Sequence, residues 1–193
     1  MRHPSSPFWR LVVLAALLAA ASPGEAADIG GVHVPDIEQV NGKNLHLNGA
    51  GRRTYSFLDI HIYIASLYLE HPSADPEQII RSPETKLLEV TFERDIGAED
   101  ARSSWRVGFA NNCLAPCHLP AAETDAFIAG VPAMHKGDRF RLLFQQNSAT
   151  ITVNDQPIGV VTDPELANAI LATFLGPKPA SPSLRQALLA GHS

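Results

Sequence analysis

The chain has 193 residues, of which 45% are apolar and 18% charged, and its formal net charge is -5 at pH 7. This length favours one domain, and this composition is typical of a globular chain with a hydrophobic core rather than of a disordered or fibrous one. The acidic balance argues against a nucleic-acid-binding protein, because that function needs a basic face.

The first 26 residues have the features of a secretion signal. Two arginines give a basic start, the segment 11–21 is apolar but too short to span a bilayer, and Gly24-Glu25-Ala26 places small residues where a signal peptidase cuts. We therefore expect residues 1–26 to be a cleaved signal peptide and residues 27–193 to form the mature domain, periplasmic or secreted and not membrane-spanning. A retained membrane anchor is the alternative.

A short hairpin and a glycine-containing connection open the predicted fold. The segment 32–40 alternates weakly between apolar and polar residues, and Asn41-Gly42 is typical of a two-residue hairpin turn. Gly49-Ala50-Gly51 follows, and Arg52 and Arg53 come next. We expect a sharp turn at the glycines, where the backbone passes close to another group and an arginine is fixed for binding an anion. A plain hairpin turn with solvated arginines is the alternative.

The segment 56–69 is the strongest predicted strand. Strict alternation places three isoleucines on one face and polar or aromatic residues on the other: Ile60, Ile62 and Ile64 against Asp59, His61 and Tyr63. The isoleucine face is expected to pack into a core. The other face mixes apolar bulk with hydrogen-bonding groups, as the wall of a ligand cavity does, although a half-solvated outer face has the same composition.

The remaining sequence alternates helix and strand patterns. The predicted helices cover 76–81, 98–112, 120–130, the segment from 164 to Gly176, and 182–189. All but 98–112 begin at a proline, and 98–112 has acidic residues in its first turn. Predicted strands cover 86–94, 139–145, 149–153 and 158–161. Antiparallel strand groups with helices between and after them predict an α+β fold, a largely antiparallel sheet with helices packed on one face. Trp105 is expected to pack in the core.

The two cysteines, Cys113 and Cys117, lie four positions apart. In an exported protein the oxidising compartment favours a disulfide that closes this small loop, provided that the geometry allows it. With His118, the segment also resembles the haem-attachment pattern Cys-x-x-Cys-His with one extra residue, and a redox pair or metal site is a further alternative. The histidines show no metal-ligand spacing, so we expect no metal and no cofactor.

Four segments match motifs of a known family. Leu47–Arg53 looks like its Gly-Gly-Ala-Gly-x-Arg turn, and Tyr63–Leu69 looks like the strand that follows. Leu88–Asp95 looks like a sheet strand ending in Arg-Asp, and Ala172–Leu189 looks like the C-terminal helix, glycine turn and Ser-Pro-x-Leu helix. The chain thus resembles the chalcone isomerase-like superfamily, in particular its exported bacterial members, over nearly all of the expected mature chain. The resemblance implies an open-faced β-sandwich.

The resemblance also implies site residues. In plant chalcone isomerases an arginine holds the phenolate or enolate during cyclisation, and in related fatty-acid-binding members the same arginine pairs with a tyrosine to hold a carboxylate. Arg53 matches this arginine, and Thr173 matches the C-terminal threonine of the isomerases. Tyr63 replaces their strand threonine. The predicted helix 98–112 lacks their tyrosine, although Asn111-Asn112 lies near the expected asparagine.

We therefore expect a non-catalytic protein that binds a small amphipathic or fatty carboxylate, or an aromatic ligand, in a cleft between sheet and helices. The expected ligand-binding residues are Arg53, Tyr63, Thr173 and His61. A guanidinium is a permanent cation with a planar donor fork, which suits an oxyanion and a carboxylate alike.

Two alternatives stay open. An intramolecular lyase of chalcone isomerase type would use Arg53 as a catalytic residue that stabilises the oxyanion, with Tyr63 or His61 moving a proton. An interaction module of an envelope complex would instead use Arg53 structurally, paired with Asp59, Asp95 or backbone carbonyls. The sequence leaves open whether Arg52 or Arg53 faces the cleft.

Overall fold

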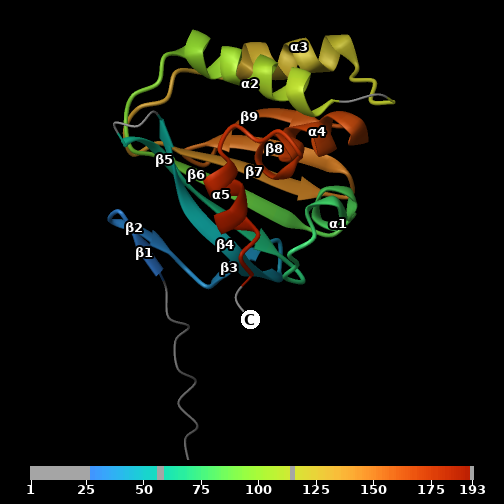
Figure 1. Cartoon of the computed structure of the whole chain (residues 1–193). Coiled ribbons are helices and arrows are strands. Elements are labelled where there is room, and N and C mark those ends of the chain that lie inside the picture. Colours follow the sequence, from blue (N-terminus) through green and yellow to red (C-terminus); the bar gives the residue numbers. More distant parts are fainter. Residues whose placement is uncertain (1–26, 56–58, 114–115, 192–193) are drawn as a thin grey trace, which may run out of the picture.

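The computed structural model describes residues 27–55, 59–113 and 116–191. The expected signal peptide, residues 1–26, lies outside the described residues. The described chain forms a seven-stranded sheet in the order β3-β4-β5-β6-β7-β8-β9, with every neighbouring pair antiparallel, and a separate hairpin, β1-β2 (Figure 1). This architecture confirms the predicted α+β fold.

The strands follow the chain order across the sheet. Their bounds are β1 (Ala27–Ile29), β2 (Val32–Val34), β3 (Ile37–Val40), β4 (Lys43–Tyr55), β5 (Ile60–Leu69), β6 (Lys86–Phe92), β7 (Arg139–Gln145), β8 (Ser148–Val153) and β9 (Gln156–Val161). The helices are α1 (Pro76–Arg81), α2 (Ala98–Asn112), α3 (Ala121–Gly130), α4 (Pro164–Leu175) and α5 (Pro182–Leu188).

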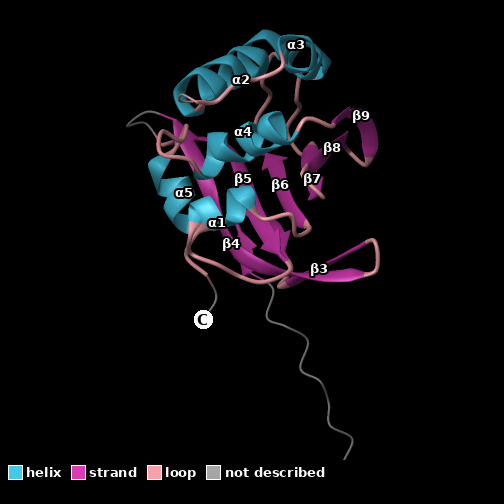
Figure 2. Ribbon diagram, turned by 90° about the vertical axis from the view of Figure 1, so that its right-hand side faces the viewer, coloured by secondary structure: helices cyan, strands magenta, loops and turns pink. Residues whose placement is uncertain are grey.

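The helices cover one face and one end of the sheet. Figure 2 shows α1, α4 and α5 beside the sheet, with α2 and α3 above α4. Helix α4 is central, since it contacts α1, α2, α5, β8 and β9. Its start follows from local sequence, because Asp163 accepts a hydrogen bond from the Leu166 backbone N–H and Pro164 occupies the first turn. Most of its side chains are buried.

Strand β4 runs through Gly49-Ala50-Gly51 without a break, so the expected sharp turn is wrong. A Cβ atom at Gly49 would collide with the backbone oxygen of Ala187 in α5, and one at Gly51 would lie 2.6 Å from the Ala187 Cβ. The backbone does pass close to another group, but that group is α5. These glycines therefore lie within strand β4 and allow α5 to pack closely on it.

The sheet curls away from the helices. Glu38 Oε2 on β3 lies 3.4 Å from Arg141 Nη2 on β7, although β4, β5 and β6 separate these strands in the sheet. The Asn41 side chain also donates to Gln145 Oε1 at 3.1 Å. The curl separates a large core between sheet and helices from a smaller core around Tyr68, to which the β1-β2 hairpin contributes.

A bulge in β5 decides which way His61 points. The register between β4 and β5 shifts and leaves Ile62 as an extra residue on β5. Alternation fails across a bulge, so His61 and Tyr63 do not share a face. Tyr63 packs in the large core, whereas His61 Nδ1 lies 3.9 Å from Glu93 Oε1. The expected common polar face is therefore wrong.

Candidate ligand-binding site

Arg53 and Tyr63 lie directly opposite each other on β4 and β5. The Arg53 Cζ atom is 5.5 Å from the centroid of the Tyr63 ring, within cation–π range. Tyr63 is only 7% exposed, and this burial raises the pKa of its phenol, although Arg53 partly opposes the shift. The phenol is therefore neutral at pH 7 and its O–H can donate a hydrogen bond.

Arg52 points to the opposite face of β4, because successive strand residues alternate. Its Nε atom donates to Glu93 Oε2 at 2.8 Å, which makes Arg52 part of an ion pair. Arg53 forms no ion pair with Asp59, Asp95 or another carboxylate in the described part of the chain. Arg53 instead lies over Tyr63, a residue of the large core between sheet and helices, so Arg53 is the arginine on the helix side of the sheet.

His61 belongs to the Arg52 side of the sheet. Its Nε2 atom lies 3.3 Å from Asp59 Oδ2, and its Nδ1 atom lies near Glu93, the partner of Arg52. The structure therefore does not bring His61 together with Arg53 and Tyr63. Its role in ligand binding stays a prediction.

Thr173 lies on α4, where it faces α2. Its hydroxyl donates to the Ile170 backbone oxygen at 2.8 Å, one turn earlier in the same helix. A Cβ atom at Gly108 of α2 would lie 2.9 Å from Thr173 Cγ2, so the two helices touch at this point. The hydroxyl is thus already engaged, and a contact between Thr173 and a ligand also stays a prediction.

An aromatic surface extends from Tyr63 toward α2. The Tyr63 ring centroid is 5.7 Å from that of Phe92 and 6.5 Å from that of Phe174, and Phe174 is 6.0 Å from Trp105. Phe92, Phe174 and Trp105 are only half-buried. Trp105 also contacts rings of the core, as expected. Sequence reasoning did not assign Phe92 and Phe174 to this surface, because their spacing along the chain carries no sign that they meet.

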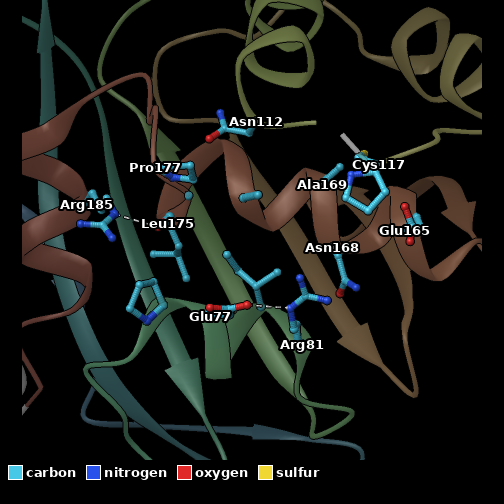
Figure 3. A pocket seen from close by; sticks show the side chains of 15 residues that line it. Glu77, Arg81, Asn112, Cys117, Glu165, Asn168, Ala169, Leu175, Pro177 and Arg185 are labelled. Carbon is cyan, nitrogen blue, oxygen red and sulfur yellow. Dashed lines mark hydrogen bonds and ion pairs between the residues drawn. The ribbon is translucent and has the colours of Figure 1, made fainter. Parts of the chain in front are cut away.

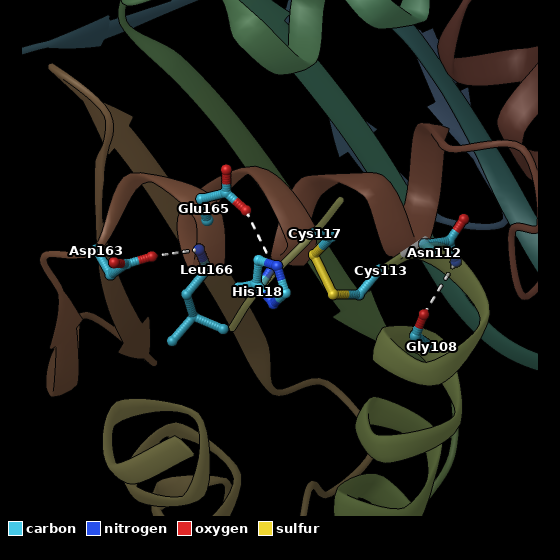
Figure 4. The surroundings of a disulfide bond; sticks show 8 residues. All are labelled: Gly108, Asn112, Cys113, Cys117, His118, Asp163, Glu165 and Leu166. Atoms are coloured by element: carbon cyan, nitrogen blue, oxygen red, sulfur yellow. Dashed lines mark hydrogen bonds between the residues drawn. A yellow bond between two sulfur atoms is a disulfide. The ribbon is translucent and has the colours of Figure 1, made fainter. Parts of the chain in front are cut away.

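Cys113 and Cys117 form a disulfide with their Cα atoms 5.2 Å apart (Figure 4). The predicted disulfide is therefore confirmed, and neither thiol is free to attach haem or bind a metal. Beside it, the Asn112 side chain donates to the Gly108 and Lys178 backbone oxygens and accepts from the Lys178 backbone N–H. These bonds tie the end of α2 to the segment that follows α4.

Two hollows lie elsewhere on the surface. One of about 520 Å³ lies between α1, α4 and the disulfide (Figure 3), and one of about 190 Å³ lies between α3 and β9. Neither is lined by Arg53, Tyr63, Thr173 or His61. Neither of these two hollows is therefore the expected cleft at Arg53.

Among the described residues, histidine, cysteine and carboxylate side chains do not gather in a group that could hold a metal ion. No described helix combines the length and apolar character that crossing a membrane requires.

The curled antiparallel sheet with helices on one face makes this an α+β protein. The chain belongs to the chalcone isomerase-like family, because the family model of that description matches residues 26–190. The sequence matches no curated protein.

Among solved structures, the fold is similar to that of a fatty-acid binding protein from Arabidopsis thaliana. The TM-score is 0.70, the sequence identity is 13%, and the match covers 86% of this chain and 96% of that chain. At this low identity the similarity shows a shared fold and nothing further.

Proposed function

We propose that this protein is a non-catalytic binding protein for a small amphipathic or fatty carboxylate, whose head group is held by Arg53 and Tyr63. The observation that carries the proposal is the Arg53 guanidinium, which lies over the buried Tyr63 ring without a carboxylate partner in the described chain. The planar donor fork and a neutral phenol together suit the two oxygens of a carboxylate.

The neighbouring aromatic surface would hold the apolar part of the ligand. Phe92, Phe174 and Trp105 keep part of their rings exposed beside Tyr63. Covering such rings with an acyl chain or an aromatic group removes apolar area from water, which favours binding. The similar plant structure is described as a fatty-acid binding protein, and this shared fold supports the proposal by analogy.

The two alternative functions have less support. A cyclase needs a group that moves a proton. His61 lies on the far side of the sheet from Arg53, beside Glu93. Tyr63 lies beside Arg53, but burial raises the pKa of its phenol, which makes it a poor proton acceptor. If the protein were an envelope interaction module, Arg53 would be expected to pair with Asp59, Asp95 or backbone carbonyls. Neither carboxylate pair is among the ion pairs of the described residues.

We also propose that the protein acts outside the cytoplasm after cleavage behind Ala26. The disulfide supports this location, because such bonds persist in oxidising compartments. Intact-mass analysis of the protein purified from its own cells should give a chain that starts at Ala27. A chain that retains residues 1–26 would contradict cleavage.

Calorimetric titration with dodecanoate tests the proposed function. Because a hydrogen bond to a charged group contributes about 1.5–3 kcal/mol, Arg53→Gln should weaken binding by roughly 10- to 100-fold. Tyr63→Phe keeps the ring and removes only the hydroxyl, so we expect a loss of about 5-fold.

Arg52→Gln is the matched control, because it removes the neighbouring charge on the opposite face and should change the affinity by less than about 3-fold. Thermal melting of each variant shows whether it is folded. Equal affinities of the two arginine variants, or no binding by the unaltered protein to a panel of fatty and aromatic acids, would overturn the proposal.

A further inference from the structure

The 520 Å³ hollow, here called the α1–α4 groove, has an apolar floor and a polar rim (Figure 3). Ala169, Ala172 and Leu175 of α4 are buried at the floor, and Ile80 of α1 is half-buried beside them. A hollow of this size lies within the range of small-molecule sites, which are mostly apolar with a few polar groups.

The groove is formed by one face of α4. Asn168, Ala169 and Ala172 lie three, four and seven positions after Glu165, so all four share a helix face. The two alanines are short, which leaves space between α1 and α4. Phe174 contacts Tyr63 and Trp105 instead, so the groove is separate from the Arg53 surface.

Arg185 supplies a fixed cation at one side of the groove. Its Nε atom donates to the Leu175 backbone oxygen at 2.7 Å, which orients the guanidinium and leaves its terminal N–H groups for another acceptor. Among the described residues no carboxylate forms an ion pair with Arg185, whereas Arg81 on the same rim is paired with Glu77 at 3.2 Å.

The rest of the rim carries one further carboxylate, Glu165, which lies near Cys117 at the end of the groove away from Arg185 (Figure 3). Asn168 projects from α4 between Ala169 and Arg81 (Figure 3). On the other side, Cys117 lines the groove, and its disulfide to Cys113 ties that wall to the end of α2. The groove thus combines a preformed apolar floor, an oriented cation and a braced wall.

We infer that the α1–α4 groove is a second ligand site, which takes a small amphipathic anion. Arg185 binds its carboxylate or sulfonate head group, and the apolar body lies on Ala169, Ala172 and Leu175. The inference does not depend on the Arg53 site, because no residue is shared between the two.

The probe for this site is 8-anilinonaphthalene-1-sulfonate, a small amphipathic anion whose fluorescence rises in apolar surroundings. Titration followed by fluorescence gives the affinity, and amide chemical shifts from NMR locate the probe on the intact protein. We expect the shifts to concentrate at Ala169, Ala172 and Arg185. Shifts concentrated at Tyr63 and Phe174 would place the probe on the other surface and overturn the inference.

Two variants test the groove directly. Arg185→Gln removes the cation and should weaken the probe's binding by about 10-fold or more. Ala172→Leu fills the floor and should abolish binding, and it also decides the test if Arg185→Gln folds poorly. Arg106→Gln is the matched control, since Arg106 is an exposed arginine of α2 paired with Glu99, and it should change affinity by less than about 2-fold. Unchanged affinity in Ala172→Leu would overturn the inference.

Discussion

Arg52 and Arg53 are neighbours in the sequence but have different electrostatic surroundings. Strand alternation sends Arg52 to the Glu93 carboxylate and Arg53 to the Tyr63 ring. An arginine in an ion pair has its charge neutralised locally, whereas one beside an aromatic ring keeps donors available for an anion. A difference of one position therefore separates a structural arginine from a candidate binding residue.

Lys86 is a buried cation that should make stability depend on pH. It is 4% exposed, and its Nζ atom donates to the Ser82 backbone oxygen at the end of α1. Burial lowers the pKa of Lys86 from 10.5 to about 8, although the Glu84 charge partly opposes this shift. Between these two values the unfolded chain binds more protons than the folded chain. The free energy of unfolding should therefore rise with pH across this window, by up to about 3 kcal/mol.

Lys86→Met should remove this rise. The variant should be more stable than the unaltered protein at pH 7, and the two should converge as the pH approaches 10. Urea denaturation at intervals of one pH unit measures the difference. If the free energy of unfolding changed with pH in the same way in both proteins, this pH dependence could not be assigned to Lys86.

The contact between β4 and α5 shows how a packed helix restricts which residues a strand can contain. Gly49 has the extended conformation of a strand, yet it has no room for a side chain because the Ala187 backbone of α5 lies against it. Asn48 strengthens the same contact, since its side chain donates to the Leu188 backbone oxygen at 2.8 Å. The helix position thus depends on two adjacent strand residues.

Gly49→Ala should therefore destabilise the protein by about 2–3 kcal/mol, because backbone atoms must move to admit the methyl group. Gly159→Ala in β9 is the matched control: a Cβ atom there meets nothing within 4 Å, so the change should stay within about 0.5 kcal/mol. Urea denaturation of both variants measures the two effects. Similar losses of stability in both would show that close packing on α5 is not the cause.

At the scale of the whole molecule, the curl of the sheet creates two cores on its two faces. The smaller core contains Tyr68, which is 1% exposed, with Leu45, Leu47 and Leu87. The Glu38–Arg141 ion pair joins the two sides of the curl, but both side chains keep about a quarter of their surface exposed. Burial of Tyr68 should therefore contribute more to the curl than the ion pair does.

Tyr68→Ala should lower the free energy of unfolding by about 3–5 kcal/mol, the usual range for removing a buried aromatic side chain. Glu38→Gln should lower it by less than about 1 kcal/mol, because partly exposed ion pairs contribute little. Denaturation in guanidinium chloride and in urea compares the variants, since salt screens the ion pair but not the core. A larger loss for Glu38→Gln would contradict this order.

Local sequence predicted most of the helices and strands, because nearby residues determine where these elements begin and end. The predicted helix 98–112 coincides with α2, and Asp163 and Ser181 cap α4 and α5 with side-chain hydrogen bonds. Helix caps depend on residues within a few positions of one another, so no knowledge of the remaining chain is needed. The disulfide between Cys113 and Cys117 was predicted on a different basis, the expected export of the chain to an oxidising compartment.

The sequence by itself determined the α+β class, the helix ends, the disulfide and, through family resemblance, the candidate pair Arg53 and Tyr63. Only the tertiary structure decided that Gly49 lies within a strand under α5, that Ile62 forms a bulge, and that His61 faces away from Tyr63. The reason is physical: a glycine or an extra strand residue fits several backbone conformations. The neighbouring element that packs against it selects which one is adopted.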